Sequence, residues 1–112
     1  MHIRQKTPIK IGWHKPPKGW FKLNIDASFG SGTQKYGLGG VFWNVNGHWI
    51  VGFGKLSYVS RSLEAEIKAL LEGFKTAQEW GMRPLIIETD SVEVVNAPAE
   101  GDDPLVHIQA RK

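Results

Sequence analysis

The spacing of apolar residues changes near residue 60 from the period of strands to that of a helix, and this change constrains the fold more than any other feature. Before it, apolar and polar side chains alternate, which is the period of a half-buried strand. From residue 62 to 80 apolar residues recur at helical spacing, and Pro84–Thr89 is again a short apolar run. Strands followed by a helix and a further strand predict an α/β domain.

The first part of the chain predicts an antiparallel meander. Residues Trp20–Ala27 alternate as one strand, and a polar, glycine-rich loop from Gly30 to Gly37 follows. Residues 38–45 and 48–56 predict two more strands joined by Asn46-Gly47, a strong hairpin signal.

The second part predicts helices and a fourth strand. A stripe of apolar residues runs along the helix over 62–80: Leu63, Ile67, Leu70, Leu71, Phe74 and Ala77. Ser60 or Ser62 is expected to cap this helix at its start, and Gly81 to end it. A right-handed helical crossover should place strand 84–89 parallel to a meander strand, giving a mixed sheet with helices packed on it.

Two further helices are expected after that strand. Asp90-Ser91 should begin a short helix that Pro98 stops, and Asp103 should cap a last helix from Pro104. The expected order is β-β-β-α-β-α-α.

Composition limits the classes of protein to consider. The 112 residues fit one domain, and the absence of cysteine excludes disulfides and thiolate metal sites. No apolar run is long enough for a membrane span, so we expect no membrane partner and an intracellular protein, in the nucleus or the cytoplasm. The net charge of +3 is compatible with a polyanionic partner. Residues 1–19 form a basic, proline-containing arm, and 20–112 the domain.

Two aspartates are expected at neighbouring strand ends. Asp26 lies near the end of the first strand, on the face opposite its apolar residues, and Asp90 follows strand 84–89. If these strands are parallel neighbours, the two backbones lie about 4.8 Å apart. Two carboxylates that close repel each other unless a cation lies between them, and Mg²⁺ prefers such oxygen ligands.

A third ligand could come from the helix. On a helical wheel Glu66 lies roughly 70° to one side of the apolar stripe and Glu64 roughly 90° to the other, while Glu72 points away. The wheel therefore rejects Glu72 and leaves Glu64 and Glu66 open.

Each acid also has a structural interpretation. Asp90 with Glu93 fits a capping box, Glu66 fits a solvated helix edge, and Asp26 could pair with Lys22 on the same strand face. The three acids together, each at the end of a suitable element, favour a site.

An ordered series of short motifs then resembles ribonuclease H-like domains, most closely the plant branch found in retroelement reverse transcriptases and in free-standing host proteins. The matching motifs are Trp13–Trp20 with Lys22–Asp26, Gly37–Val41 with Asn46-Gly47 and Trp49, Ser62–Leu70, and Ile86–Ser91.

The resemblance implies a function and selects Glu66. In that family the glutamate of an Ala-Glu-hydrophobic step binds metal, which here is Glu66, and the aspartates correspond to Asp26 and Asp90. Such enzymes hydrolyse the RNA strand of RNA–DNA hybrids with two Mg²⁺ ions, for which Mn²⁺ can substitute. Backbone amides of the 30–37 loop and the basic stretch Arg4–Lys22 would contact the nucleic acid.

The sequence also departs from the family pattern. Asp26-Ala27-Ser28 stands where an Asp-Gly-Ala-like step is usual. The family continues into a fifth strand and a last helix with a fourth carboxylate, so we expect a domain truncated before both; Asp102, Asp103 and His107 do not match those positions. The alternatives are a catalytically impaired nucleic-acid-binding module and a structural domain whose acids are caps and surface charges.

Overall fold

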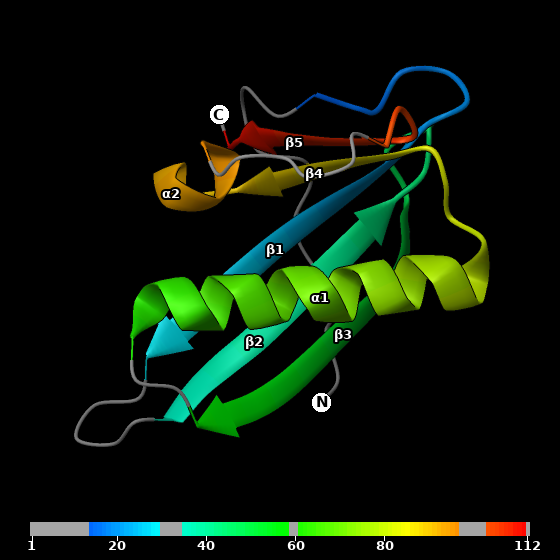
Figure 1. Cartoon of the computed structure of the whole chain (residues 1–112). Helices are drawn as coiled ribbons and strands as arrows, with labels where there is room; N and C mark the ends of the chain where they lie inside the picture. Colours follow the sequence, from blue (N-terminus) through cyan, green and yellow to red (C-terminus); the bar gives the residue numbers. More distant parts are fainter. Residues whose placement is uncertain (1–13, 30–34, 59–60, 97–102, 112) are drawn as a thin grey trace.

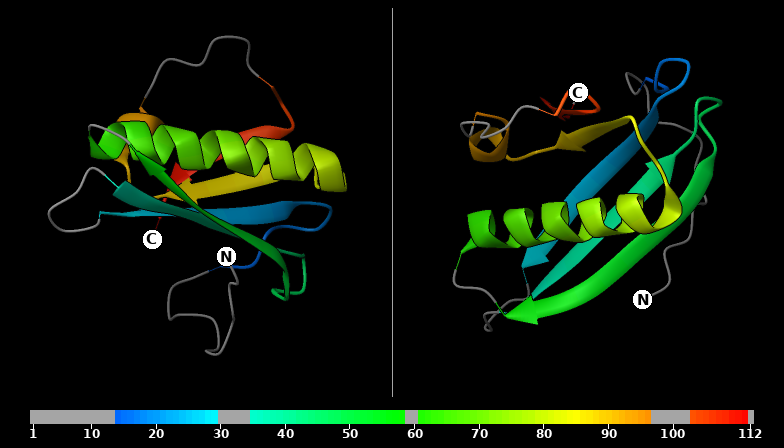
Figure 2. Two further views of the ribbon diagram at one scale, coloured as in Figure 1. Left: turned by 90° about the horizontal axis from the view of Figure 1, so that it is seen from below. Right: turned by 45° about the vertical axis from the view of Figure 1, so that its right-hand side comes forward.

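The structure is a computed structural model that describes residues 14–29, 35–58, 61–96 and 103–111. One mixed sheet of five strands in the order β3-β2-β1-β4-β5 forms the centre, and the long helix α1 crosses one of its faces (Figures 1 and 2). The elements are β1 (Phe21–Phe29), β2 (Lys35–Trp43), β3 (Trp49–Tyr58), α1 (Ser62–Trp80), β4 (Leu85–Thr89), α2 (Val92–Val95) and β5 (Val106–Ala110). Within the described ranges, no helix is both long and apolar enough to cross a membrane.

The predicted meander is confirmed, with shifted boundaries. β1 pairs antiparallel with β2, and β2 with β3. β2 begins at Lys35, so the loop between β1 and β2 is shorter than predicted. The hairpin loop is longer than Asn46-Gly47 alone: the side-chain oxygen of Asn44 accepts hydrogen bonds from the N–H groups of Asn46 and His48, and Gly47 takes a φ of 76°.

The predicted parallel crossover is also confirmed. After α1 the chain returns to β4, which lies beside β1 in parallel, with Phe21 opposite Leu85 and Asn24 opposite Glu88. The carboxyl ends of β1 and β4 therefore meet at one edge of the sheet.

The predicted helix from Pro104 is wrong, and so is the expected truncation before a fifth strand. Residues Val106–Ala110 form β5, parallel to β4. β-branched Val106 and Ile108 pack against the core while His107 is exposed, which is the period of a strand. Asp103 does stabilise a turn, because its side chain accepts a hydrogen bond from the N–H of Leu105, but no helix follows.

Both ends of α1 lie where the sequence predicted, although its cap differs. Gly81 follows the last helical residue with a φ of 66°, the left-handed conformation expected of a C-terminal glycine. Arg61 takes the N-cap position and makes no side-chain capping bond. The predicted serine cap is therefore wrong: Ser62 is already helical, and Ser60 lies outside the described residues.

The predicted apolar stripe of α1 is confirmed only in part: Ala77 is buried and Leu70 and Phe74 pack against the core, but the fully buried face consists of small residues. Its buried residues are Ala65, Ala69, Gly73 and Ala77. In contrast, Ile67 and Leu71 are 43% and 59% exposed. Small side chains allow the helix to lie close to β1: a Cβ on Gly73 would come within 2.4 Å of Leu23 Cδ2. The core beneath is built from side chains that are at most 1% exposed: Leu23, Ile25, Leu38, Phe42, Leu85 and Ile87.

This close contact predicts the effect of enlarging Gly73. Gly73→Val should lower the free energy of unfolding by about 1–3 kcal/mol, because the new side chain must displace the fully buried Leu23. Lys75→Val, at an exposed position of the same helix, is the control for the helix propensity of valine. It should change the free energy of unfolding by less than about 1 kcal/mol. Urea denaturation measures both, and equal effects would contradict the packing argument.

Candidate functional site

Asp26 and Asp90 both lie at the edge where β1 and β4 end. The last parallel pair joins Asn24 to Glu88, and the two aspartates lie two residues further along their strands. Both are exposed, and Asp26 Oδ1 accepts a hydrogen bond of 2.9 Å from the N–H of Ala27. The parallel pairing thus brings acids 64 positions apart in the sequence to one end of the sheet.

Glu66 reaches the same edge from α1. Its Oε2 accepts a hydrogen bond of 3.2 Å from the hydroxyl of Thr89, the last residue of β4, which is fully buried. The helix thereby places a third carboxylate beside Thr89, the residue before Asp90.

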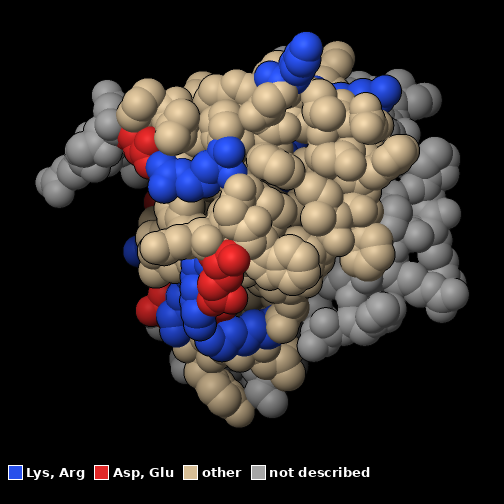
Figure 3. All heavy atoms as spheres, turned by 90° about the vertical axis from the view of Figure 1, so that its right-hand side faces the viewer, with Lys and Arg blue, Asp and Glu red and all other residues tan. Residues whose placement is uncertain are grey.

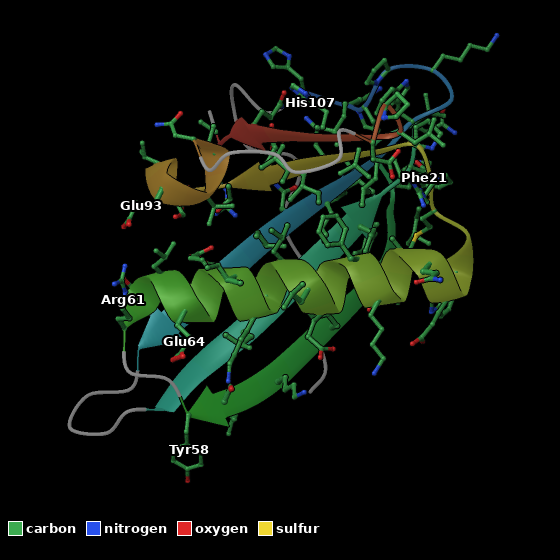
Figure 4. The ribbon with its side chains drawn as sticks, viewed as in Figure 1. Phe21, Tyr58, Arg61, Glu64, Glu93 and His107 are labelled. Carbon is green, nitrogen blue, oxygen red and sulfur yellow. The ribbon has the colours of Figure 1, made fainter. Side chains whose placement is uncertain are left out.

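The true buried face of α1 separates Glu66 from Glu64. Measured from the centre of the small-residue face, Glu66 lies at about 40° and Glu64 at about 160°. Figure 4 shows Glu64 on the side of α1 that faces away from β4. The helical wheel left this choice open because the predicted stripe included Ile67 and Leu71, which are exposed, and so its centre was displaced from the buried face.

The electrostatics of Glu66 show that these acids influence one another. Burial raises the pKa of Glu66 above its ordinary value; the hydrogen bond from Thr89 lowers it, the charges of Asp26 and Asp90 raise it, and the charge of Arg111 lowers it. The net change is upward. An acid whose pKa is raised by burial and by neighbouring acids is a candidate member of a cation-binding or acid–base site.

The raised pKa of Glu66 predicts a pH-dependent stabilisation by Glu66→Gln. In the wild type, the contribution of Glu66 to stability is present below its unfolded pKa and is lost as pH rises through the higher folded pKa. Glutamine removes this loss, so the melting temperature at pH 7 should rise by about 2–4 °C, after allowance for solvent screening. At pH 4 the variant should gain little or nothing. Thermal melts at both pH values measure this, and a gain that is equal at both would contradict it.

Two structural interpretations of the aspartates do not hold. Ser91, not Asp90, is the N-cap of α2, and its hydroxyl accepts a hydrogen bond from the N–H of Val94. Lys22 forms its ion pair with Glu88. Neither capping of α2 nor an ion pair with Lys22 therefore accounts for these two acids.

Arg111 is a residue of this edge that the sequence analysis missed. Its backbone N–H donates to the carbonyl of Thr89 at 2.9 Å, and its Nη1 lies 3.3 Å from Oδ2 of Asp90. Its Nη2 donates to the carbonyl of Ile25. Had residues 106–110 been predicted as a strand beside β4, Arg111 would have been expected next to Asp90.

A second polar group lies away from this edge and was also missed. Lys22 and Glu88 form an ion pair of 3.3 Å with side chains only 3% and 4% exposed. Asn24 and Gln109 donate hydrogen bonds of 2.9 Å to the Glu88 carboxylate, and Lys22 donates to the carbonyl of His14. Burial raises the pKa of Glu88, but the hydrogen bonds from Asn24 and Gln109 and the charge of Lys22 together outweigh it, so the pKa of Glu88 is lowered.

The donor chemistry at the strand-end edge fits a hard divalent cation. Asp26, Glu66 and Asp90 offer carboxylate oxygens, the ligands that Mg²⁺ prefers. In the described part of the chain, however, no three His, Cys, Asp or Glu side chains are grouped closely enough to hold a metal ion as they stand. Each carboxylate instead has a protein partner: Ala27 N–H, Thr89 Oγ1 and Arg111, respectively.

Comparison with protein families agrees with this arrangement. The family described as reverse transcriptase-like matches residues 24–103, which is more than half of the chain and includes all three acids. The chain belongs to the reverse transcriptase-like family. Among curated protein sequences, none matches this reverse transcriptase-like chain significantly.

Solved structures show that this reverse transcriptase-like chain has a ribonuclease H-like fold. It matches RNase H1 from the halophilic archaeon Halobacterium salinarum NRC-1 with a TM-score of 0.69 and 15% identity, over 83% of this chain and 86% of that one. LC11-RNase H1 in complex with RNA/DNA hybrid matches with a TM-score of 0.67 and 13% identity, over 81% and 84%. The protease–reverse transcriptase of prototype foamy virus matches with a TM-score of 0.67 and 16% identity, over 95% of this chain and 19% of that one.

Proposed function

We propose that this domain is a nucleic-acid-binding endonuclease of the ribonuclease H type, which hydrolyses the RNA strand of RNA–DNA hybrids by two-metal catalysis. Asp26, Glu66 and Asp90 are its metal ligands. The observation that carries the proposal is the hydrogen bond from Thr89 to Glu66, because it brings an acid from the helix to the edge where β1 and β4 end. The structural similarity to an RNase H1 in complex with RNA/DNA hybrid supports the choice of substrate.

The chain's own residues would prepare this edge for a phosphate diester. Mg²⁺, or Mn²⁺ in its place, would lower the pKa of an attacking water and withdraw charge from the phosphate. Thr89 orients the Glu66 carboxylate, and the parallel pairing of β1 with β4 fixes the backbones that carry Asp26 and Asp90. Burial is the main cause of the raised pKa of Glu66, and the charges of Asp26 and Asp90 add a smaller repulsion that a bound cation would relieve.

The described residues on the face of the domain shown in Figure 3 lack the uniform positive charge of a phosphate-binding surface. On the face shown in Figure 3, acidic and basic side chains of the described residues lie side by side rather than in a field of one sign. We therefore expect the hybrid to contact the strand-end edge, with the basic arm adding sequence-independent attraction.

The assay that tests the proposal compares substrates and metals. We expect the protein to cut labelled RNA in an RNA–DNA hybrid when Mg²⁺ or Mn²⁺ is present, and to stop when EDTA is added. Duplex DNA of the same sequence should remain uncut, because it lacks the 2′-hydroxyl groups through which RNA is distinguished.

The ion pair between Arg111 and Asp90 favours one alternative, a module that binds the hybrid without cutting it. Binding of the hybrid in a gel-shift assay, with no cleavage at any metal concentration, would support this alternative and overturn the catalytic proposal. Absence of both binding and cleavage would overturn both.

A further inference from the structure

The guanidinium of Arg111 joins the ends of β1 and β4 at the carboxylate edge. The backbone of Arg111 is fixed by its hydrogen bond to Thr89, one residue before Asp90. From there one nitrogen of its side chain reaches the Asp90 carboxylate and another reaches the carbonyl of Ile25, one residue before Asp26. A positive charge therefore lies between the positions from which both aspartates project.

Arg111 is more deeply placed than the acid it pairs with. Its side chain is 26% exposed, against 63% for that of Asp90. Its Nε is buried and has no hydrogen-bond partner among the described residues. A buried donor without a partner is unfavourable, so the other contacts of the guanidinium hold it at this edge against that cost.

The charge of Arg111 acts on the helix acid as well. Of the charged groups that influence Glu66, Asp26 and Asp90 oppose its ionisation and Arg111 favours it. The guanidinium is thus a counter-charge for the group of acids and not for Asp90 alone.

We propose that Arg111 is a built-in competing cation, which neutralises the carboxylate edge and raises the divalent-metal concentration needed to occupy it. The inference rests on the proposed function, since it assumes that these acids bind metal. A divalent ion that takes Asp90 as a ligand must displace or repel a guanidinium 3.3 Å from that carboxylate. Arg111 therefore acts through Asp90 as a positioning and tuning residue.

Arg111→Gln tests this inference, because glutamine keeps polar atoms but removes the charge. We expect Mn²⁺ and Mg²⁺ to bind about five- to tenfold more tightly to this variant than to the wild type, with a smaller gain at high salt. Arg83→Gln is the matched control: Arg83 lies before β4 and pairs with Asp103, so its loss should leave metal affinity unchanged. Isothermal titration with each metal alone measures these affinities without a nucleic-acid substrate.

A second measurement on the wild type avoids any folding defect of the variant. In ¹⁵N-labelled protein, the side-chain Nε–H signal of Arg111 should shift on addition of Mg²⁺, while that of Arg83 stays in place. Equal metal affinity in wild type and Arg111→Gln, or an Arg111 signal that does not respond to bound metal, would overturn the inference and leave the proposed function standing. If neither protein binds metal, the metal site of the proposed function is wrong, and this inference falls with it.

Discussion

Lys22→Met should lower the free energy of unfolding at pH 7 by about 3–5 kcal/mol, the largest stability change we expect of a single substitution in this domain. Methionine keeps the length of the side chain and removes its ammonium group. The Glu88 carboxylate, only 4% exposed, then stays buried without its counter-charge, and the bond from Lys22 to the carbonyl of His14 is lost as well.

The loss should be smaller in acid. In the wild type the lowered pKa of Glu88 contributes stability above its unfolded pKa, and this contribution is lost as pH falls through the lower folded pKa. In Lys22→Met, protonation of Glu88 removes the unpaired charge. The difference between wild type and variant should therefore shrink between pH 7 and pH 3, as measured by urea denaturation at each pH.

Two further variants separate the buried charge from other effects. Lys55→Met breaks a pair whose lysine side chain is 58% exposed, and should cost at most about 1 kcal/mol. The double variant Lys22→Met with Glu88→Gln buries no charge and should recover part of the loss. A loss below about 1 kcal/mol in Lys22→Met at pH 7 would contradict the account.

The parts of the fold that were predicted correctly have strong local signals. The boundaries of α1 follow from helical spacing and from Gly81, which takes the left-handed conformation that ends a helix. The hairpin follows from Asn46-Gly47, and the parallel position of β4 follows from the handedness of crossovers.

β5 was missed because its stability comes from distant residues. Asp103 and Pro104 give a local helix-start signal. This signal outweighed the alternation of apolar and polar residues over Val106–Ala110, which is only five residues long. What holds the strand is its parallel ladder with β4 and the hydrogen bond from Gln109 to Glu88. Neither contact is visible in the sequence around residue 106.

Only part of the candidate site was predictable, because its residues come from elements far apart in the sequence. The adjacency of Asp26 and Asp90 follows from topology alone, once β1 and β4 are parallel neighbours. The family resemblance selected Glu66, but a choice from helix geometry alone requires knowing that small residues, not Ile67 and Leu71, face the sheet. The bulky residues displaced the predicted centre of the buried face, because close packing of a helix on a strand selects small side chains at the contact.

Asp26→Asn, Glu66→Gln and Asp90→Asn should each reduce cleavage of the RNA–DNA hybrid by at least about 100-fold, the largest effect we expect on activity. Each change keeps the size of the side chain and removes one negative charge from the proposed metal ligands. Initial rates on a labelled hybrid at saturating Mg²⁺ measure the effect. Glu72→Gln is the control: Glu72 lies on the same helix but pairs with Lys55, so its rate should stay within about twofold of the wild type.

Glu66→Gln is the most informative of the three, because its expected effects on stability and activity have opposite signs. The same substitution that relieves repulsion at the strand-end edge, and so raises the melting temperature at pH 7, removes a ligand from the proposed metal site. Loss of cleavage in a variant more stable than the wild type cannot come from unfolding. Retained cleavage in Glu66→Gln, or an equal loss in Glu64→Gln, would show that this helix places a different acid at the reaction.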